Sequence, residues 1–287
     1  MTRILAVANQ KGGVAKTTTV ASLGAALAER GRRVLLVDLD PQACLTFSLG
    51  LDPDSLDLSV HDVLLGRISA GMALHQTDDG PELLPATIDL AGAEALLLTR
   101  TGREYALKSA LEDLLETADP PYDDVILDCP PSLGVLTING LTAADEVLIP
   151  LQCETLSHRG VGQLLDTVRD VQRLTNRSLT VLGVLPTLYD GRTTHARAVL
   201  ADVATRYSLP VLEPAIAKSV RFAEAPAAGR SVLRTATRTP GAEAYRVLAG
   251  VLVGESAPSV VRVPDDDATP GAEAAEPLAV AQAVGSA

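Results

Sequence analysis

Short apolar runs alternate with helix-like stretches along the first three quarters of the chain, and this alternation constrains the fold most. Each run is rich in Val, Ile and Leu and does not alternate with polar residues, as is typical of strands buried on both faces of a parallel sheet. Helical patterns occupy residues 17–30, 155–175 and 193–207. The sequence predicts an α/β fold, a mostly parallel twisted sheet with helices on both faces. The predicted strands are RILAVA (3–8), RRVLLVDLD (32–40), DDVILDCPP (123–131), EVLIPLQ (146–152), LTVLGVLPT (179–187) and LPVLEP (209–214).

The 287 residues, 47% of them apolar, are enough for one large α/β domain. We expect this domain to cover residues 1 to about 253. From residue 254 to 287 the composition shifts to Ala, Pro, Gly and Asp, which predicts an acidic, disordered tail.

Cysteine usage and hydropathy point to the cytoplasm. Cys44, Cys129 and Cys153 are too few and too scattered for a disulfide framework, so we expect each to be a small buried apolar residue in a reducing compartment. The sequence shows no signal peptide and no apolar run of transmembrane length. We therefore expect a cytoplasmic protein.

The segment NQKGGVAKTTT (9–19) lies between a predicted strand and a predicted helix, where a phosphate-binding loop belongs. Gly12 and Gly13 allow a tight turn that exposes N–H groups, and a helix beginning near Lys16 adds further donors. Lys16 is expected to reach the β- and γ-phosphates of a nucleotide, and the Thr17 hydroxyl to ligate Mg²⁺. The predicted nucleotide-binding residues are Lys11, Gly12, Gly13, Val14, Ala15, Lys16, Thr17 and Thr18.

Carboxylates follow two other predicted strands. Asp38 and Asp40 end one strand and Asp128 ends another. Ligands in open α/β sheets bind at the carboxyl ends of the strands, so these side chains are expected to meet the phosphate loop. A single Asp after a strand is more often a turn or cap residue, and the specific signal is that all three segments occur together.

The segments KGGVAKTT, VLLVDLDPQ and VILDCPPSLG resemble the deviant phosphate-loop ATPases of the ParA/MinD superfamily, closest to the short, Soj-like chromosomal ParA proteins. The resemblance covers roughly residues 3–250. It implies an ATP-bound homodimer in which Lys11 reaches the partner's ATP. It also implies that Lys11, Lys16 and Asp40 are catalytic, with Asp40 positioning the attacking water, and that Thr17, Asp128 and nearby Asp38 form the Mg²⁺ site.

The pattern G-x-x-x-x-G-K-[ST] requires glycine at positions 10 and 15, where this chain has Gln10 and Ala15. Ala15 also departs from the family's usual glycine. A methyl group there tolerates negative φ but penalises positive φ. Helix-like angles would make Ala15 harmless, whereas a positive φ would weaken nucleotide affinity or turnover.

The formal net charge is −12, yet charge is unevenly distributed. Residues 1–176 carry 13 Lys and Arg against 25 Asp and Glu, residues 177–246 carry 10 against 5, and residues from 254 onward carry 1 against 6. The resemblance implies non-specific DNA binding by the ATP dimer, a ParB-like activator, a role in chromosome partitioning, and association with the nucleoid. The expected DNA-binding residues are Arg192, Lys218, Arg221 and Arg230, with Arg234 as a possible addition.

The resemblance alone leaves three other functions to compare with the sequence. The acidic tail lacks the basic amphipathic helix that MinD-like membrane binding needs. An iron–sulfur cluster needs two suitably placed cysteines, and Cys129 beside Asp128 is expected to lie in the core. A positioning ATPase for a protein cargo, with little or no DNA binding, stays open because the chain is acidic overall.

Overall fold

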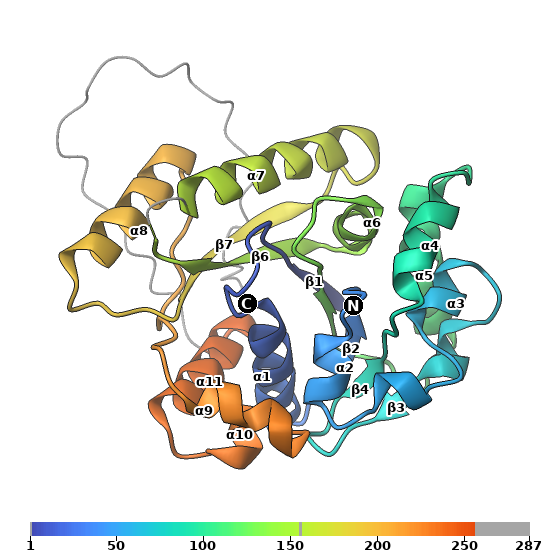
Figure 1. The fold of residues 1–287 in the computed structure, drawn as a ribbon, viewed down its shortest axis with the longest axis horizontal. Helices are drawn as coiled ribbons and strands as arrows, with labels where there is room; N and C mark the ends of the chain where they lie inside the picture. The colour runs from blue at the N-terminus through green and yellow to red at the C-terminus, as the bar shows by residue number, and fades with distance from the viewer. Residues whose placement is uncertain (1, 155–156, 256–287) are drawn as a thin grey trace.

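A seven-stranded sheet forms the centre of the molecule in the computed structural model, which describes residues 2–154 and 157–255 (Figure 1). The strand order is β3-β4-β2-β5-β1-β6-β7, and only the β3–β4 pair is antiparallel. The strands are β1 (Arg3–Val7), β2 (Val34–Asp38), β3 (His75–Gln76), β4 (Glu82–Leu84), β5 (Asp124–Asp128), β6 (Glu146–Gln152) and β7 (Thr180–Thr187).

Helices cover both faces of this sheet, as predicted. Successive residues of one strand belong to opposite faces: in β2, Leu36 packs with α1 and α11, whereas Leu35 and Val37 pack with the helices of the other face. This explains why the strands read as unbroken apolar runs. The helices are α1 (Lys16–Ala28), α2 (Cys44–Ser48), α3 (Val60–Leu64), α4 (Leu90–Leu97), α5 (Ala106–Thr117), α6 (Val135–Ala143), α7 (Ser157–Leu174), α8 (Thr194–Tyr207), α9 (Arg221–Glu224), α10 (Val232–Thr235) and α11 (Pro240–Leu252).

One predicted strand, residues 209–214, is wrong. Only Val211 forms an isolated bridge, with Val184 of β7. Pro210 and Pro214 have no N–H to donate, so the pairing cannot extend into a ladder. The segment is still fastened to the sheet, because Val184 N–H donates to Pro210 and Leu212 N–H donates to Val184, each at 2.8 Å.

The sequence also made predictions about helices, the C-terminal tail and membrane-spanning segments. The helices predicted at 17–30, 155–175 and 193–207 are confirmed as α1, α7 and α8. The tail predicted for 254–287 lies outside the described residues apart from Gly254 and Glu255. None of the helices within the described ranges is both long and apolar enough to cross a membrane.

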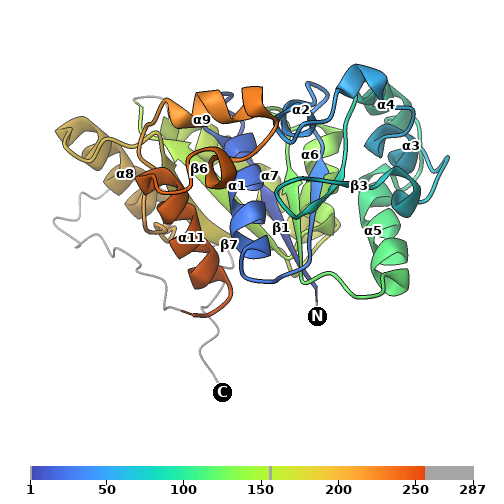
Figure 2. The ribbon, with the colours of Figure 1, turned by 90° about the horizontal axis from the view of Figure 1, so that it is seen from below.

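The carboxyl ends of the parallel strands lie on one side of the molecule, which sets the place of the candidate site. Figure 2 shows α2, α4 and α9 on the side opposite the N-terminus. The phosphate loop follows β1, and the carboxylates of β2 and β5 lie on the two strands next in the sheet order, with Asp38 in register with Asp128. The fold therefore gathers the predicted residues at one edge.

Candidate functional site: the loop after β1 and its cavity

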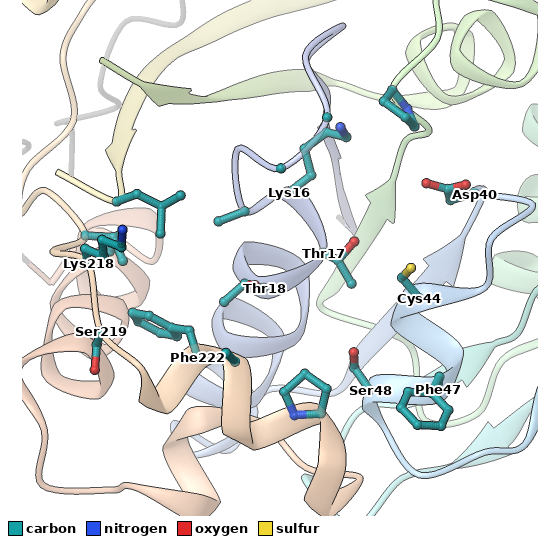
Figure 3. A pocket seen from close by; sticks show the side chains of 18 of the residues that line it. Lys16, Thr17, Thr18, Asp40, Cys44, Phe47, Ser48, Lys218, Ser219 and Phe222 are labelled. Carbon is teal, nitrogen blue, oxygen red and sulfur yellow. The ribbon is translucent and has the colours of Figure 1, made fainter. Parts of the chain in front are cut away.

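A cavity of about 1030 Å³ lies beside the loop between β1 and α1. Gly12, Gly13, Lys16 and Thr17 line one wall, and Asp40 lies across from them on the segment between β2 and α2 (Figure 3). Leu188, Ile216, Lys218, Val220 and Phe222 contribute to the lining, and Phe47 and Pro226 also line it. The cavity thus has a polar end, with glycines and a cation, and is largely apolar elsewhere. This lining suits a ligand with a phosphate chain and a planar base.

The loop backbone is held from both ends. Asn9 is buried, accepts the Lys11 N–H at 3.0 Å, and donates to the Pro150 carbonyl in β6 at 2.7 Å. Val14 is also buried, and its carbonyl accepts the Thr187 hydroxyl at 2.9 Å. These bonds fix the turn, so its N–H groups do not depend on a ligand for their arrangement.

Ala15 adopts the left-handed conformation, with φ 63° and ψ 34°. Of the two possibilities for this residue, helix-like angles or a positive φ, the structure therefore shows the positive φ. Its carbonyl accepts the Thr19 N–H at 2.9 Å as α1 begins, so the angle is part of how the loop enters the helix. Ala43, before α2, is left-handed as well, with φ 51°. Each non-glycine residue in this region costs roughly 1–2 kcal/mol.

We expect Ala15→Gly to raise the free energy of unfolding by about 0.5–1 kcal/mol, since removed strain outweighs the greater entropy of glycine in the unfolded chain. Urea unfolding measures this change. Ala21→Gly, inside the helix that follows, is the control and should lower the unfolding free energy by about 1 kcal/mol or more. Equal destabilisation by the two substitutions would contradict a strained Ala15.

Lys16 is the first residue of α1, and the residue is only 7% exposed. Its Nζ donates to the Lys11 carbonyl at 3.2 Å. Burial lowers the pKa of the Lys16 ammonium, while the nearby Asp128 carboxylate opposes that shift. A buried cation beside the loop is available to an anion without first losing a shell of water.

Asp38 and Asp128 are both buried but differ in their bonding. Asp38 accepts hydrogen bonds from Asp40 N–H, Thr46 N–H and the Thr46 hydroxyl at 3.1, 2.9 and 2.8 Å. It therefore braces the segment that carries Asp40. The Thr17 hydroxyl lies near enough to Asp128 to favour its charged form, yet neither Asp128 oxygen has a hydrogen bond of ordinary geometry within the described residues.

Burial raises the pKa of both carboxyls, that of Asp38 to about 6 and that of Asp128 well above its ordinary range, where the Asp38 charge adds to the shift. A divalent cation would reverse that tendency because it favours the charged carboxylate. Asp128 thus fits a metal site better than Asp38, because the oxygens of Asp38 already accept hydrogen bonds from residues 40 and 46.

Asp40 lines the cavity, and its carboxylate accepts the Gln42 N–H at 3.0 Å.

Of the three cysteines, Cys44 departs from expectation: it is exposed and lines the cavity at the start of α2, rather than packing in the core. Cys129 is buried as expected, and Cys153 is partly buried.

The four residues predicted to bind DNA have different surroundings. Lys218 lines the cavity beside α1. Arg192 pairs with Asp190 at 2.8 Å and Arg221 with Glu224 at 2.7 Å. Arg230 pairs with Asp78 at 2.6 Å, next to Arg234 and the β3–β4 turn. Each of the three arginines therefore has a carboxylate beside it.

Sequence reasoning missed the apolar walls of the cavity and one polar partner. Leu188 follows β7, so the rule that ligands bind at the carboxyl ends of strands could have indicated it. Glu154 follows β6 in the same way, and its carboxylate contacts Lys11. Ile216 and Val220 precede α9 and Phe222 lies within this four-residue helix, so no periodic pattern could have indicated them.

A protein-family model described as AAA domain matches residues 2–181. Soj from Bacillus subtilis is 44% identical over 87% of this chain and 97% of its own length. The chromosome partitioning protein ParA from Caulobacter vibrioides is 42% identical over 86% of this chain and 92% of its own. Among solved structures, Cobyrinic Acid a,c-diamide synthase from Mycobacterium smegmatis with bound ADP and magnesium is 64% identical, covers 88% of this chain and 94% of its own, and has a TM-score of 0.78. The chain therefore belongs to the ParA/MinD superfamily of P-loop ATPases, together with Soj and ParA.

Proposed function

We propose that this protein is a Mg²⁺-dependent ATPase that hydrolyses ATP slowly and switches from monomer to homodimer when it binds ATP. The observation that carries the proposal is that Lys16, Thr17 and Asp40 line one cavity beside the loop after β1, with the buried carboxylate of Asp128 close to Lys16 and Thr17. A relative named chromosome partitioning protein ParA supports the choice. A related structure that contains ADP and magnesium supports the ligands.

Each residue near the loop has a role in this proposal. The N–H groups of residues 11–18 and the Lys16 ammonium hold the phosphates, and the apolar walls receive the adenine. Thr17 and Asp128 would hold Mg²⁺, which would neutralise charge on the phosphate oxygens. Residues 2–154 and 157–255 contain no group of three or more His, Cys, Asp or Glu side chains that could hold a metal ion by itself. Few protein ligands are usual for Mg²⁺, which keeps waters and phosphate oxygens.

Asp40 orients the attacking water, because its carboxylate lines the cavity opposite Lys16 without an ion-pair partner in the described part of the chain. Lys11 crosses to the partner subunit's ATP. Both sites are complete only in the dimer, so turnover is slow until a ParB-like partner favours the hydrolytic arrangement. The ATP dimer binds DNA without sequence preference, which would place the protein on the nucleoid in chromosome partitioning.

The name of the Mycobacterium smegmatis relative raises amide synthesis as another activity. A synthase that took its nitrogen from glutamine by thiolate attack would need an activated cysteine. Burial raises the pKa of Cys44 and Cys129, and raises that of Cys153 to about 11. None of these three thiols is prepared as a nucleophile, which favours the partitioning ATPase.

Non-specific DNA binding can be tested on two arginines. Arg192→Ala and Arg221→Ala should each weaken DNA binding by the ATP-bound protein and flatten its dependence on salt by about one unit of slope per lost phosphate contact. Fluorescence anisotropy at several stated salt concentrations measures both quantities. Arg173→Ala is the matched control, because Arg173 is an exposed arginine that pairs with Asp170 at 2.9 Å on α7, outside the basic stretch.

A positioning ATPase for a protein cargo is the second candidate, and the carboxylates beside Arg192, Arg221 and Arg230 favour it. Each arginine must leave its acidic partner before it contacts a phosphate, which reduces the gain. The ATPase rate with and without DNA, and with a peptide from a candidate ParB, separates the two candidates. Unchanged DNA binding in both arginine variants, or none in the wild type, would support the cargo function.

A further inference from the structure

Lys11 lies away from the large cavity that Lys16 lines. Its Nζ contacts the Glu154 Oε2 at 2.5 Å, and the two side chains are 35% and 55% exposed. Lys11 lines a separate hollow of about 450 Å³ together with Asn9, Ser157 and Gly160. Its side chain is therefore turned toward the end of β6 rather than toward the place where a phosphate chain would lie.

The backbone groups of both Lys11 and Glu154 make hydrogen bonds to neighbouring residues. The Lys11 N–H donates to buried Asn9, and the Lys11 carbonyl accepts the Lys16 ammonium. The Glu154 N–H donates to the Ser157 hydroxyl at 3.1 Å, and the Ser157 N–H donates to the Glu154 carbonyl at 2.9 Å. The ion pair thus joins two backbone positions that are each held by hydrogen bonds, Lys11 after β1 and Glu154 after β6.

We propose that Glu154 is a positioning residue that holds Lys11 in a resting place and thereby opposes ATP-dependent dimerisation. The inference rests on the proposed dimer switch. A lysine ammonium is a compact point charge, so the Glu154 carboxylate and a phosphate oxygen of the partner's ATP compete for it. The interface of a two-fold dimer is isologous, so each subunit contributes one Lys11. Two Lys11–Glu154 pairs must therefore open for each dimer that forms.

The size of the effect follows from the exposure of the pair. One exposed ion pair shifts an equilibrium by roughly 1.5- to fivefold, so two pairs shift the dimer constant by roughly two- to thirtyfold. Glu154→Gln keeps the size of the side chain and removes its charge. The variant should therefore dimerise with a non-hydrolysable ATP analogue at roughly two- to thirtyfold lower protein concentration than the wild type. Sedimentation velocity measures this shift.

Two comparisons separate this role from a general effect of lost negative charge. Glu94→Gln removes a carboxylate that lies against Gly134, in the loop after β5, and should leave the dimer constant unchanged. Nucleotide affinity at protein concentrations that keep the chain monomeric should be the same in Glu154→Gln and in the wild type. An equal gain in both glutamine variants would overturn the positioning role.

A zero-length carbodiimide cross-link tests the resting contact directly, without reference to dimerisation. Nucleotide-free wild type should yield a peptide in which the Lys11 amine and Glu154 carboxyl are joined, and addition of the ATP analogue should reduce it. Absence of that peptide, or a dimer constant that Glu154→Gln leaves unchanged, would overturn the inference while the dimer switch stands. A wild type that never dimerises with ATP would overturn both.

Discussion

Lys11→Ala is expected to bind nucleotide as a monomer with unchanged affinity, while it loses ATP-dependent dimerisation and slows hydrolysis by roughly 10³–10⁵-fold, the range known for cations supplied in trans to phosphoryl transfer. The reason is geometric. Lys16 lines the phosphate cavity and is buried there, whereas Lys11 points out of it. The Lys11 ammonium therefore cannot duplicate Lys16 within one subunit.

Calorimetry with ADP and phosphate release with ATP measure the two quantities. Lys108→Ala, on α5, is the matched control because it removes the same charge from a helix that does not line the cavity. Lys11→Ala protein that hydrolyses ATP at the wild-type rate would show that Lys11 is an ordinary surface charge.

Asp40→Ala should separate binding from chemistry. Asp40 touches no other charged side chain that the structure describes at ion-pair distance, and it lies across the cavity from Lys16 (Figure 3). Loss of a group that orients and deprotonates water slows hydrolysis by roughly 10²–10⁴-fold. ATP should still bind, so the variant should accumulate as an ATP-bound dimer, which light scattering and nucleotide extraction detect.

Asp40→Asn provides the control for shape, since it keeps the volume and can still accept a hydrogen bond from the Gln42 N–H. If Asp40→Asn is as slow as Asp40→Ala, charge is the essential property. Normal hydrolysis in either variant, or a monomer that holds ATP, would contradict the proposed role.

Sequence patterning predicted the sheet and the phosphate loop because both depend on local chemistry. Buried strands need continuous apolar runs, and the turn before α1 needs glycines and a lysine at fixed spacing. The same patterning failed at residues 209–214, where apolar residues suggested a strand but two prolines prevent a ladder. It gave no sign of β3 and β4, which have only two and three residues.

Tertiary contacts decided the features that the sequence could not predict. Arg230 and Asp78 are 152 residues apart in the chain, and Lys11 and Glu154 are 143 apart, so neither pair could be inferred from local spacing. The hydrogen bonds that Thr46 donates to Asp38 likewise depend on how α2 packs. The angle of Ala15 depended likewise on how the loop is anchored to β6 and β7.

The most direct test of the dimer switch is the mass of the wild-type protein in solution with ADP and with a non-hydrolysable ATP analogue, each with Mg²⁺. Only ATP carries the terminal phosphate that Lys11 of a second subunit would meet. Sedimentation equilibrium should therefore give a monomer with ADP and a dimer with the analogue. The same mass with both nucleotides would contradict the switch.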